Sequence, residues 1–389
     1  MLRARLAGRM RGKMTTTTET YESLLERVCT ESVAPQAPAV DRDGAFPTQS
    51  IRALTAAGLL GAFSSTGSGG LELGLPGAAR IVRRVAEECG STAMVLTMHY
   101  CGVAVLEAHG PKDVCAAAAS GEHLSTLAFS ESGSRSHFWA PVSTASELDG
   151  KVQLHASKSW VTSAAHATAY VWSSRPLAAD GASTIWLVPA SSPGLTVAGP
   201  FEGLGLRGND SSPVTAAGVE LPSSAMLGGD GQGFEIMTSI VLPVFAVLNA
   251  ACSNGLMAGA IRRMVDHVTH IRHSDTGAAL AELPTIRNYI ARMRVKADLS
   301  DALVGDTIAA IAAKRADAMV RVLECKAAAG ESANEVLDLA MRVCGGAAFR
   351  KELGIERMFR DARASGVMAP TTDVLYDFLG KAVCGMPLF

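Results

Sequence analysis

Residues 204–234 read LGLRGNDSSPVTAAGVELPSSAMLGGDGQGF, and this stretch decides the fold. Its middle part, VTAAGVELP, is one of a series of short apolar segments separated by turn residues, which predicts a β-strand. Its last part, LGGDGQGF, is rich in glycine and breaks the pattern, and from there to the end of the chain the pattern is helical. The stretch therefore marks the passage from a β-domain into a helical domain.

Upstream of this stretch the chain is expected to hold a β-domain and, before it, a helical domain. Five or six short strands at close spacing, separated by turn signals such as ELDGK and AADGAS, predict a small antiparallel sheet or barrel over residues 126–226. Residues 19–125 have helical periodicity instead, and STAMVLTMHYCGVAVLEAHG is apolar on most faces, which indicates a buried helix. The first 14 residues include five basic and no acidic residues. Residues 1–18 are expected to lie outside the fold, as a disordered segment or as a non-native start.

Downstream of it, residues 227–389 are expected to form a bundle of long antiparallel helices. One helix follows Phe234 and has a possible kink at Pro243, and a second is predicted from Pro284 to Ala329. A capping box from Ser332 to Glu335 predicts the start of a third. The chain thus reads as mainly α with a middle β-domain.

Composition excludes several classes of function. The net charge of -2 does not indicate binding to nucleic acid. The sequence contains no uninterrupted run of about 18 apolar residues, so no membrane span is predicted. The eight cysteines form no C-x-x-C pair and are expected to be free thiols in a cytoplasmic protein. His267, His270 and His273 recur every third residue, so on a helix they drift round the surface and do not predict a metal site.

Two further motifs have weak functional interpretations. GLGLRG, residues 203–208, matches the G-x-G-x-x-G pattern, but a strand follows it rather than a helix, so a loop of the β-domain is the better interpretation. SESGSRSHF, residues 130–138, reads either as a polar loop or as a loop whose small residues and amides face an anionic phosphate group. No G-x-S-x-G motif supports a serine hydrolase.

Taken together, the segments resemble the acyl-CoA dehydrogenase family over roughly residues 41–389. LAFSESGSRS resembles the first family signature, SKSWVTSAAHA resembles the Trp-Ile-Thr segment, and the stretch at 204–234 closely follows the run that leads into the C-terminal bundle. RVCGGAAFRKELGIERMFRDAR resembles the second signature. The order and spacing of all these segments match the family.

The resemblance implies an N-terminal helical domain, a middle β-domain and a C-terminal four-helix bundle, with FAD between the last two, in a homodimer or homotetramer. It implies that Arg272 reaches the FAD pyrophosphate of a neighbouring subunit and that Trp160 and Thr162 flank the isoalloxazine ring. The full set of implied cofactor residues is Phe129, Ser130, Ser136, Trp160, Thr162, Arg272, Gly345, Gly346, Thr371 and Asp373.

The chain departs from the family where the chemistry is expected. The family's usual catalytic glutamate, which removes the α-proton, corresponds to Ala369, and Pro370 replaces the glycine after it. Phe245 stands where an arginine usually lies near the substrate, and Arg342 stands where the family often has glutamine. His137 is the candidate for a replacement base, because the ordinary pKa of histidine lies near neutrality, although a loop histidine without a proton role is the commoner case.

Three hypotheses follow. The first is a FAD-dependent oxidoreductase acting on an acyl thioester of CoA or acyl carrier protein, with a non-standard or absent base and an external electron acceptor. The second is a flavin-dependent monooxygenase on the same fold, which uses reduced flavin, oxygen and a flavin reductase. The third is a degenerate scaffold that only binds flavin or a thioester.

Overall fold

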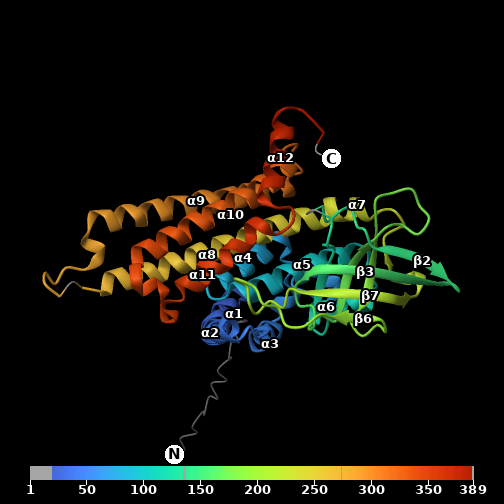
Figure 1. The fold of residues 1–389 in the computed structure, drawn as a ribbon, viewed down its shortest axis with the longest axis horizontal. Helices are drawn as coiled ribbons and strands as arrows, with labels where there is room; N and C mark the ends of the chain where they lie inside the picture. Colours follow the sequence, from blue (N-terminus) through green and yellow to red (C-terminus); the bar gives the residue numbers. More distant parts are fainter. Residues whose placement is uncertain (1–19, 135–136, 273, 388–389) are drawn as a thin grey trace, which may run out of the picture.

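The N-terminal part of the protein is an array of α-helices. The computed structural model describes residues 20–134, 137–272 and 274–387. The helix α5, Gly90–His109, is buried along almost its whole length because its residues are apolar or small on every face. It contacts both the first strand, Ser125–Ala128, and the helix Leu242–His270, so it lies between the β-sheets and the C-terminal helices (Figure 1). The other N-terminal helices are α1 Tyr21–Val28, α2 Ala34–Asp43, α3 Thr48–Ala56, α4 Gly74–Ala86 and α6 Lys112–Ser120.

The middle of the chain forms two four-stranded sheets. One has the order β1-β4-β5-β8 and the other β2-β3-β7-β6. All pairs are antiparallel except β1 with β4. The strands are β1 Ser125–Ala128, β2 Thr144–Leu148, β3 Lys151–Val161, β4 Ala169–Ser174, β5 Thr184–Pro189, β6 Leu195–Val197, β7 Ser212–Leu221 and β8 Met226–Leu227.

Alternation along the strands builds the core of the β-domain. In β7 every second residue is buried over most of the strand, so Val214, Ala216 and Val219 point inward. They share one apolar cluster with Trp172 of β4 and Trp186 of β5, which come from the other sheet. The sequence interpretation of VTAAGVELP as a strand is confirmed.

The C-terminal part is a bundle of long helices that extends away from the β-domain (Figure 1). A continuous helical stretch begins with α7, Gly233–Ile236, passes through a wide π-turn at Met237–Val241 and continues as α8. The π-turn ends just before Pro243, whose missing N–H removes a helical hydrogen bond, so the expected irregularity takes this form. The long helices are α8 Leu242–His270, α9 Pro284–Ala312, α10 Ala318–Cys344, α11 Ile355–Val367 and α12 Thr372–Val383.

The predicted helix from Pro284 to Ala329 is wrong at its C-terminal end. The structure ends α9 at Ala312 and starts α10 at Ala318, with Lys314 in the left-handed region at φ 50°. Apolar periodicity continues on both sides of this turn, which concealed it in the sequence. Ser332 therefore lies inside α10 and starts no helix.

The helical stretch Gly233–His270 is long and apolar enough to cross a membrane by length and composition alone. Its most apolar window is 72% buried inside the protein. A buried core helix passes the same test, and α8 packs against α4, α5, α9 and α10.

Candidate functional site

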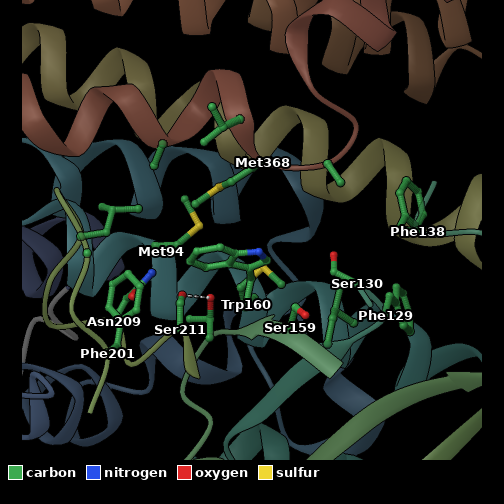
Figure 2. Close-up of a pocket in the computed structure, with 18 of the residues that line it drawn as sticks. Met94, Phe129, Ser130, Phe138, Ser159, Trp160, Phe201, Asn209, Ser211 and Met368 are labelled. Atoms are coloured by element: carbon green, nitrogen blue, oxygen red, sulfur yellow. Dashed lines mark hydrogen bonds between the residues drawn. The ribbon is translucent and has the colours of Figure 1, made fainter. Parts of the chain in front are cut away.

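A cavity of about 670 Å³ lies where the β-domain meets the helices (Figure 2). One wall comes from β1, β3 and the loop between β6 and β7, and the facing wall comes from α5, α8 and α11. The two walls differ in chemistry. Hydroxyl groups gather on the β-domain side, whereas the helical side is mostly methionine, valine and phenylalanine, with Arg360 and Arg363 of α11 beside them.

Trp160 is the most unusual residue of the β-domain wall. It sits where the pairing of β3 with β7 shifts register, and its backbone lies in the left-handed region at φ 58°. Such a bulge turns a side chain out of its strand, and this conformation is rare for a bulky residue. The indole is 69% exposed, lines the cavity and meets the edge of Phe201 at 6.4 Å between ring centroids. The result is an aromatic surface open to a flat ligand.

A buried ion pair anchors the strand beneath Trp160. Lys158 is fully buried, and its ammonium contacts the carboxylate of Glu131 and donates to the carbonyl oxygen of Ser173 at 2.7 Å. Burial alone raises the pKa of Glu131, but the charge of Lys158 and hydrogen bonds from Ser143 and from the Val142 N–H bring it below its usual range. The pair ties the start of the 131–143 loop to β3.

Hydroxyl groups on the same wall are held in place by short bonds. The Thr162 and Ser211 hydroxyls lie 3.2 Å apart, and the Thr162 carbonyl accepts from Thr126 Oγ1 at 2.7 Å. The Ser130 carbonyl accepts from the Ser159 N–H at 2.8 Å. These contacts fix the β-domain wall before any ligand binds, so its hydroxyls form a pre-organised polar edge.

The helical wall is apolar around Ala369. Met94 of α5, Phe245 of α8 and Met368 line the cavity together with Ala369. The buried side chain of Asn249 donates to Met368 Sδ at 3.4 Å and accepts from Ser365 Oγ at 2.7 Å, so it is engaged on the protein side. Among the described lining residues, the carboxylates are Glu131, which is ion-paired, and the exposed Glu202.

A buried amine holds the segment that carries Ala369. Lys326 of α10 is 1% exposed, and its Nζ donates to the carbonyl oxygens of Ser365, Met368 and Pro370 at 2.8–3.1 Å. Burial lowers the pKa of Lys326 to about 7. The Ser365 carbonyl belongs to the last turn of α11, where carbonyl groups lack a partner within the helix, and the other two follow that helix. Lys326 therefore sets the path of residues 365–370 along the cavity.

The loop before β7 is fastened to α11. Leu206 N–H donates to the Asp361 carboxylate at 2.6 Å, and Arg360 donates to Asp41 and to the Leu204 carbonyl. The loop lies very close to α11. A Cβ on Gly205 would meet the Arg360 carbonyl oxygen at 2.4 Å, which explains why this residue is glycine. The GLGLRG motif is therefore explained by the packing of this loop against α11.

Asp361 gives a testable pH dependence. Burial raises its pKa to about 6, although the Leu206 N–H and the charge of Arg357 oppose this. The folded protein therefore keeps this proton to higher pH than the unfolded chain does, so the contribution to stability is full below about pH 4 and is lost as pH rises through 6. We expect the unfolding free energy of wild type, relative to Asp361→Asn, to fall by about 3 kcal/mol between pH 4 and 7. Denaturant unfolding across this range measures it, and a difference independent of pH contradicts it.

The structure brings together some of the sequence-predicted site residues and separates others. Phe129, Ser130 and Trp160 line the cavity (Figure 2), and so does Thr162. Thr371 caps α12 by accepting from the Val374 N–H, and the exposed Asp373 lies in the first turn of that helix. Ser136 lies outside the described residues.

Arg272, Gly345 and Gly346 lie at the opposite end of the bundle. The start of α8 lines the cavity, but its 29 residues span about 40 Å before Arg272 follows its end. Gly345 follows the C-terminal end of α10 at the same remote end (Figure 1). A Cβ on either glycine would meet nothing within 4 Å, so this backbone is open to an approaching molecule. Within one chain, these residues do not join the cavity.

His137 does not reach the cavity lining. Its ring is exposed and stacks on Trp139 with the centroids 4.9 Å apart. Its role as a base therefore stays a prediction. Of the three regularly spaced histidines, whose spacing does not predict a metal site, His267 and His270 are at the end of α8 and His273 lies outside the described residues.

Three residues of the site were missed from sequence: Lys158, Lys326 and Asn209. A lysine at an inward position of a strand, as Lys158 is in β3, signals a buried partner. Lys326 stands in an otherwise apolar face of its helix and gives the same signal. Asn209 gave none.

The cavity fits a flavin ring on the residues present. It offers an exposed indole as a flat wall, serine and threonine hydroxyls at the ring's polar edge, and enough volume for the ring and a short apolar group beside it. The chemistry of the lining, polar on one side and apolar on the other, suits a ring system held against the β-domain with a substrate against the helices.

Comparison with known proteins agrees with this geometry. Models of the acyl-CoA dehydrogenase family match along the chain: its N-terminal domain over residues 15–117, its middle domain over 126–219 and its C-terminal domain over 231–384. Cyclohex-1-ene-1-carbonyl-CoA dehydrogenase of Geobacter metallireducens is 25% identical over 92% of this chain and 96% of its own. The human mitochondrial short-chain specific acyl-CoA dehydrogenase is 26% identical over 92% of this chain and 88% of its own.

Solved structures share the fold. Butyryl-CoA dehydrogenase from Megasphaera elsdenii superposes with a TM-score of 0.87 at 19% identity, covering 94% of this chain and 97% of the other. The FAD complex of PigA superposes with a TM-score of 0.86 at 19% identity, covering 94% and 96%. At these identities the likeness shows the fold alone.

Proposed function

We propose that this chain, which belongs to the acyl-CoA dehydrogenase family, oxidises an acyl thioester of CoA or acyl carrier protein without a carboxylate at the family's usual base position. The chain is a FAD-dependent oxidoreductase, as its family membership shows. The observation that carries the proposal is the two-sided cavity, with hydroxyls and Trp160 on one wall and an apolar surface around Ala369 on the other.

The residues of the β-domain wall are the ones that would hold the flavin. Trp160 would cover the ring, and the Ser130 and Thr162 hydroxyls would bind its polar edge. FAD, when bound, supplies the oxidising power for removal of two hydrogens from the substrate. The protein residues orient the ring and exclude water from it.

The helical wall suits an uncharged acyl group. Met94, Phe245 and Met368 present apolar and polarizable surface, which adapts to an alkyl or cyclic group. Phe245 replaces an expected arginine with a ring, so the wall lacks a charged contact there. Phe245 gives a free carboxylate on the acyl group no charged partner to replace its hydration, whereas Arg360 and Arg363 of α11, which also line the cavity, carry charges.

The proton that leaves the substrate must be accepted by a group other than residue 369. Ala369 lines the cavity but carries no titratable group, and Asn249 is a poor base already engaged by Ser365. We expect slow oxidation of simple acyl-CoAs, or a substrate whose own chemistry makes the proton easier to lose.

The test is anaerobic mixing of the FAD-loaded protein with acyl thioesters of different chain length and carrier. Bleaching of the visible flavin band by at least one thioester is the expected result, since reduction of bound flavin accompanies oxidation of the substrate. A protein that keeps FAD but is bleached by no thioester contradicts the proposal. Oxygen-dependent product formation from supplied reduced flavin would support a monooxygenase instead.

Replacing Trp160 by alanine is expected to weaken FAD binding by about tenfold, because the exposed aromatic surface is lost. Trp160→Phe retains a flat ring and should recover most of the affinity. Titration of the apoprotein with FAD, followed by flavin fluorescence, measures both. If wild type and Trp160→Ala bind FAD with equal affinity, Trp160 is not part of the flavin site.

We also propose that the site is completed by a second copy of the chain. Arg272, Gly345 and Gly346 are far from the cavity of their own chain and open to the surface, so they are placed to contact FAD held by a partner. The electrons leave to an external acceptor, because an oxidase or dehydrogenase cycle requires reoxidation of the flavin.

A further inference from the structure

Asn209 is a buried polar residue without a protein partner in the cavity. Its side chain is 1% exposed, and its Oδ1 has no hydrogen-bond partner. Among the described residues that line the cavity, it is the only one with a buried, unpartnered side-chain oxygen or nitrogen. An amide oxygen removed from water without a partner costs free energy, so such a group calls for an explanation.

The position of Asn209 is fixed by its backbone. Its N–H donates to the Leu206 carbonyl at 3.0 Å, and its carbonyl accepts from the Ser163 N–H at 2.9 Å. The first bond ties it to the loop on α11 and the second to the turn after β3. These two bonds hold the backbone within the β-domain wall, and the Asn209 side chain lines the cavity beside Phe201 (Figure 2).

The polar side chains next to Asn209 all have hydrogen-bond partners, whereas Asn209 Oδ1 has none. Asp210 accepts from Ser212 Oγ at 2.8 Å and from the Ala165 N–H at 2.7 Å. Ser211 Oγ pairs with Thr162 Oγ1. Hydrogen bonding within this turn is therefore complete except at the one side chain that faces the cavity.

We propose that Asn209 is a ligand-binding residue whose Oδ1 accepts a hydrogen bond from a hydroxyl or amide N–H of the bound molecule. The proposal rests on the proposed function, which gives two sources of that chemistry. FAD carries hydroxyl and imide N–H donors, and the pantetheine arm of an acyl thioester carries amide N–H donors. A hydrogen bond of this kind both supplies affinity and satisfies the buried acceptor.

The test uses Asn209→Leu, which keeps the size of the side chain and removes the acceptor. We expect affinity for one of the two ligands to fall by about 3- to 10-fold. Titration of the apoprotein with FAD is the first arm, and titration of the FAD-loaded protein with an acyl-CoA is the second. The arm that changes identifies which molecule Asn209 contacts.

A structural role predicts a different pattern. If Asn209 only supported the fold, the leucine variant would unfold at lower temperature and bind both ligands normally, and that result overturns the proposal. We expect instead no loss of thermal stability in the ligand-free protein, since no protein hydrogen bond is removed.

The matched control is Asn334→Leu. Asn334 lies on α10, also has a buried unpartnered Oδ1, and is not among the residues that line the cavity. Its variant should bind both ligands normally, and a loss of affinity equal to that of Asn209→Leu overturns the proposal. Asn209→Ala provides the same measurement if the leucine variant does not fold.

The outcome is separable from that of the proposed function. If no thioester reduces the flavin, the oxidation proposed above fails, but the FAD arm still reports on Asn209. If thioesters do reduce the flavin and both affinities stay at the wild-type value in Asn209→Leu, the inference about Asn209 alone fails.

Discussion

Ala369→Glu is expected to accelerate reduction of the bound flavin by a simple acyl-CoA by about 100- to 10,000-fold, the range that a positioned general base contributes. Ala369 lines the cavity on the apolar wall, and Lys326 holds the carbonyl groups on either side of it. A carboxylate there would face the substrate from the family's usual position. Stopped-flow measurement of flavin bleaching under anaerobic conditions gives the rate.

The control for this gain is Ala364→Glu. Ala364 also lines the cavity, on α11, so its variant adds the same charge to the same chamber at another place. We expect no comparable acceleration from it. If both variants react at the wild-type rate, the absence of the glutamate is not what limits ordinary dehydrogenation in this protein. Because the wall is apolar, burial should raise the pKa of the new carboxyl, and the gain should increase with pH.

Lys158→Met is expected to lower the free energy of unfolding by about 3–5 kcal/mol, which is the cost of leaving a buried charge without its partner. Lys158 and Glu131 are both almost completely buried, and Glu131 also accepts from the Val142 and Ser143 N–H groups. The methionine leaves that carboxylate uncompensated. Denaturant unfolding of the variant measures the loss.

Two further variants separate the buried charge from the loss of a side chain. Lys151→Met, on the same strand as Lys158, removes an exposed ion pair with Glu220 of β7 and should change stability very little. The double variant Glu131→Gln with Lys158→Met removes both charges and should recover part of the stability. A double variant less stable than Lys158→Met would contradict the account of a stranded carboxylate.

Much of the fold could be predicted because its patterns are local. The apolar segments of the β-domain alternate at the period of a strand, and the glycine-rich run after Leu227 ends that pattern and opens a long helical region. The three-part order of helices, sheets and helices could be predicted from these changes in the pattern of apolar and turn residues. The break at residues 313–317 could not be predicted, since the apolar pattern continues across it and only the left-handed Lys314 marks the turn.

The candidate site could be predicted only in part. Phe129, Ser130, Trp160 and Thr162 belong to short motifs near the β-domain wall, and the structure places all four on one cavity. The role of Asn209 depends on the backbone groups that hold it, and these contacts exist only in the tertiary structure. The same holds for Arg272, Gly345 and Gly346, because sequence motifs do not say that α8 and α10 carry them to the far end of the bundle.

The direction of the chemistry is the central claim, and the mass of the product tests it most directly. The FAD-loaded protein is incubated anaerobically with a reactive acyl thioester and an artificial electron acceptor, and the thioester product is weighed by mass spectrometry. Loss of two hydrogens without oxygen is the predicted result. A product that forms only in the presence of reduced flavin and oxygen, and that carries an added oxygen atom, would contradict the account.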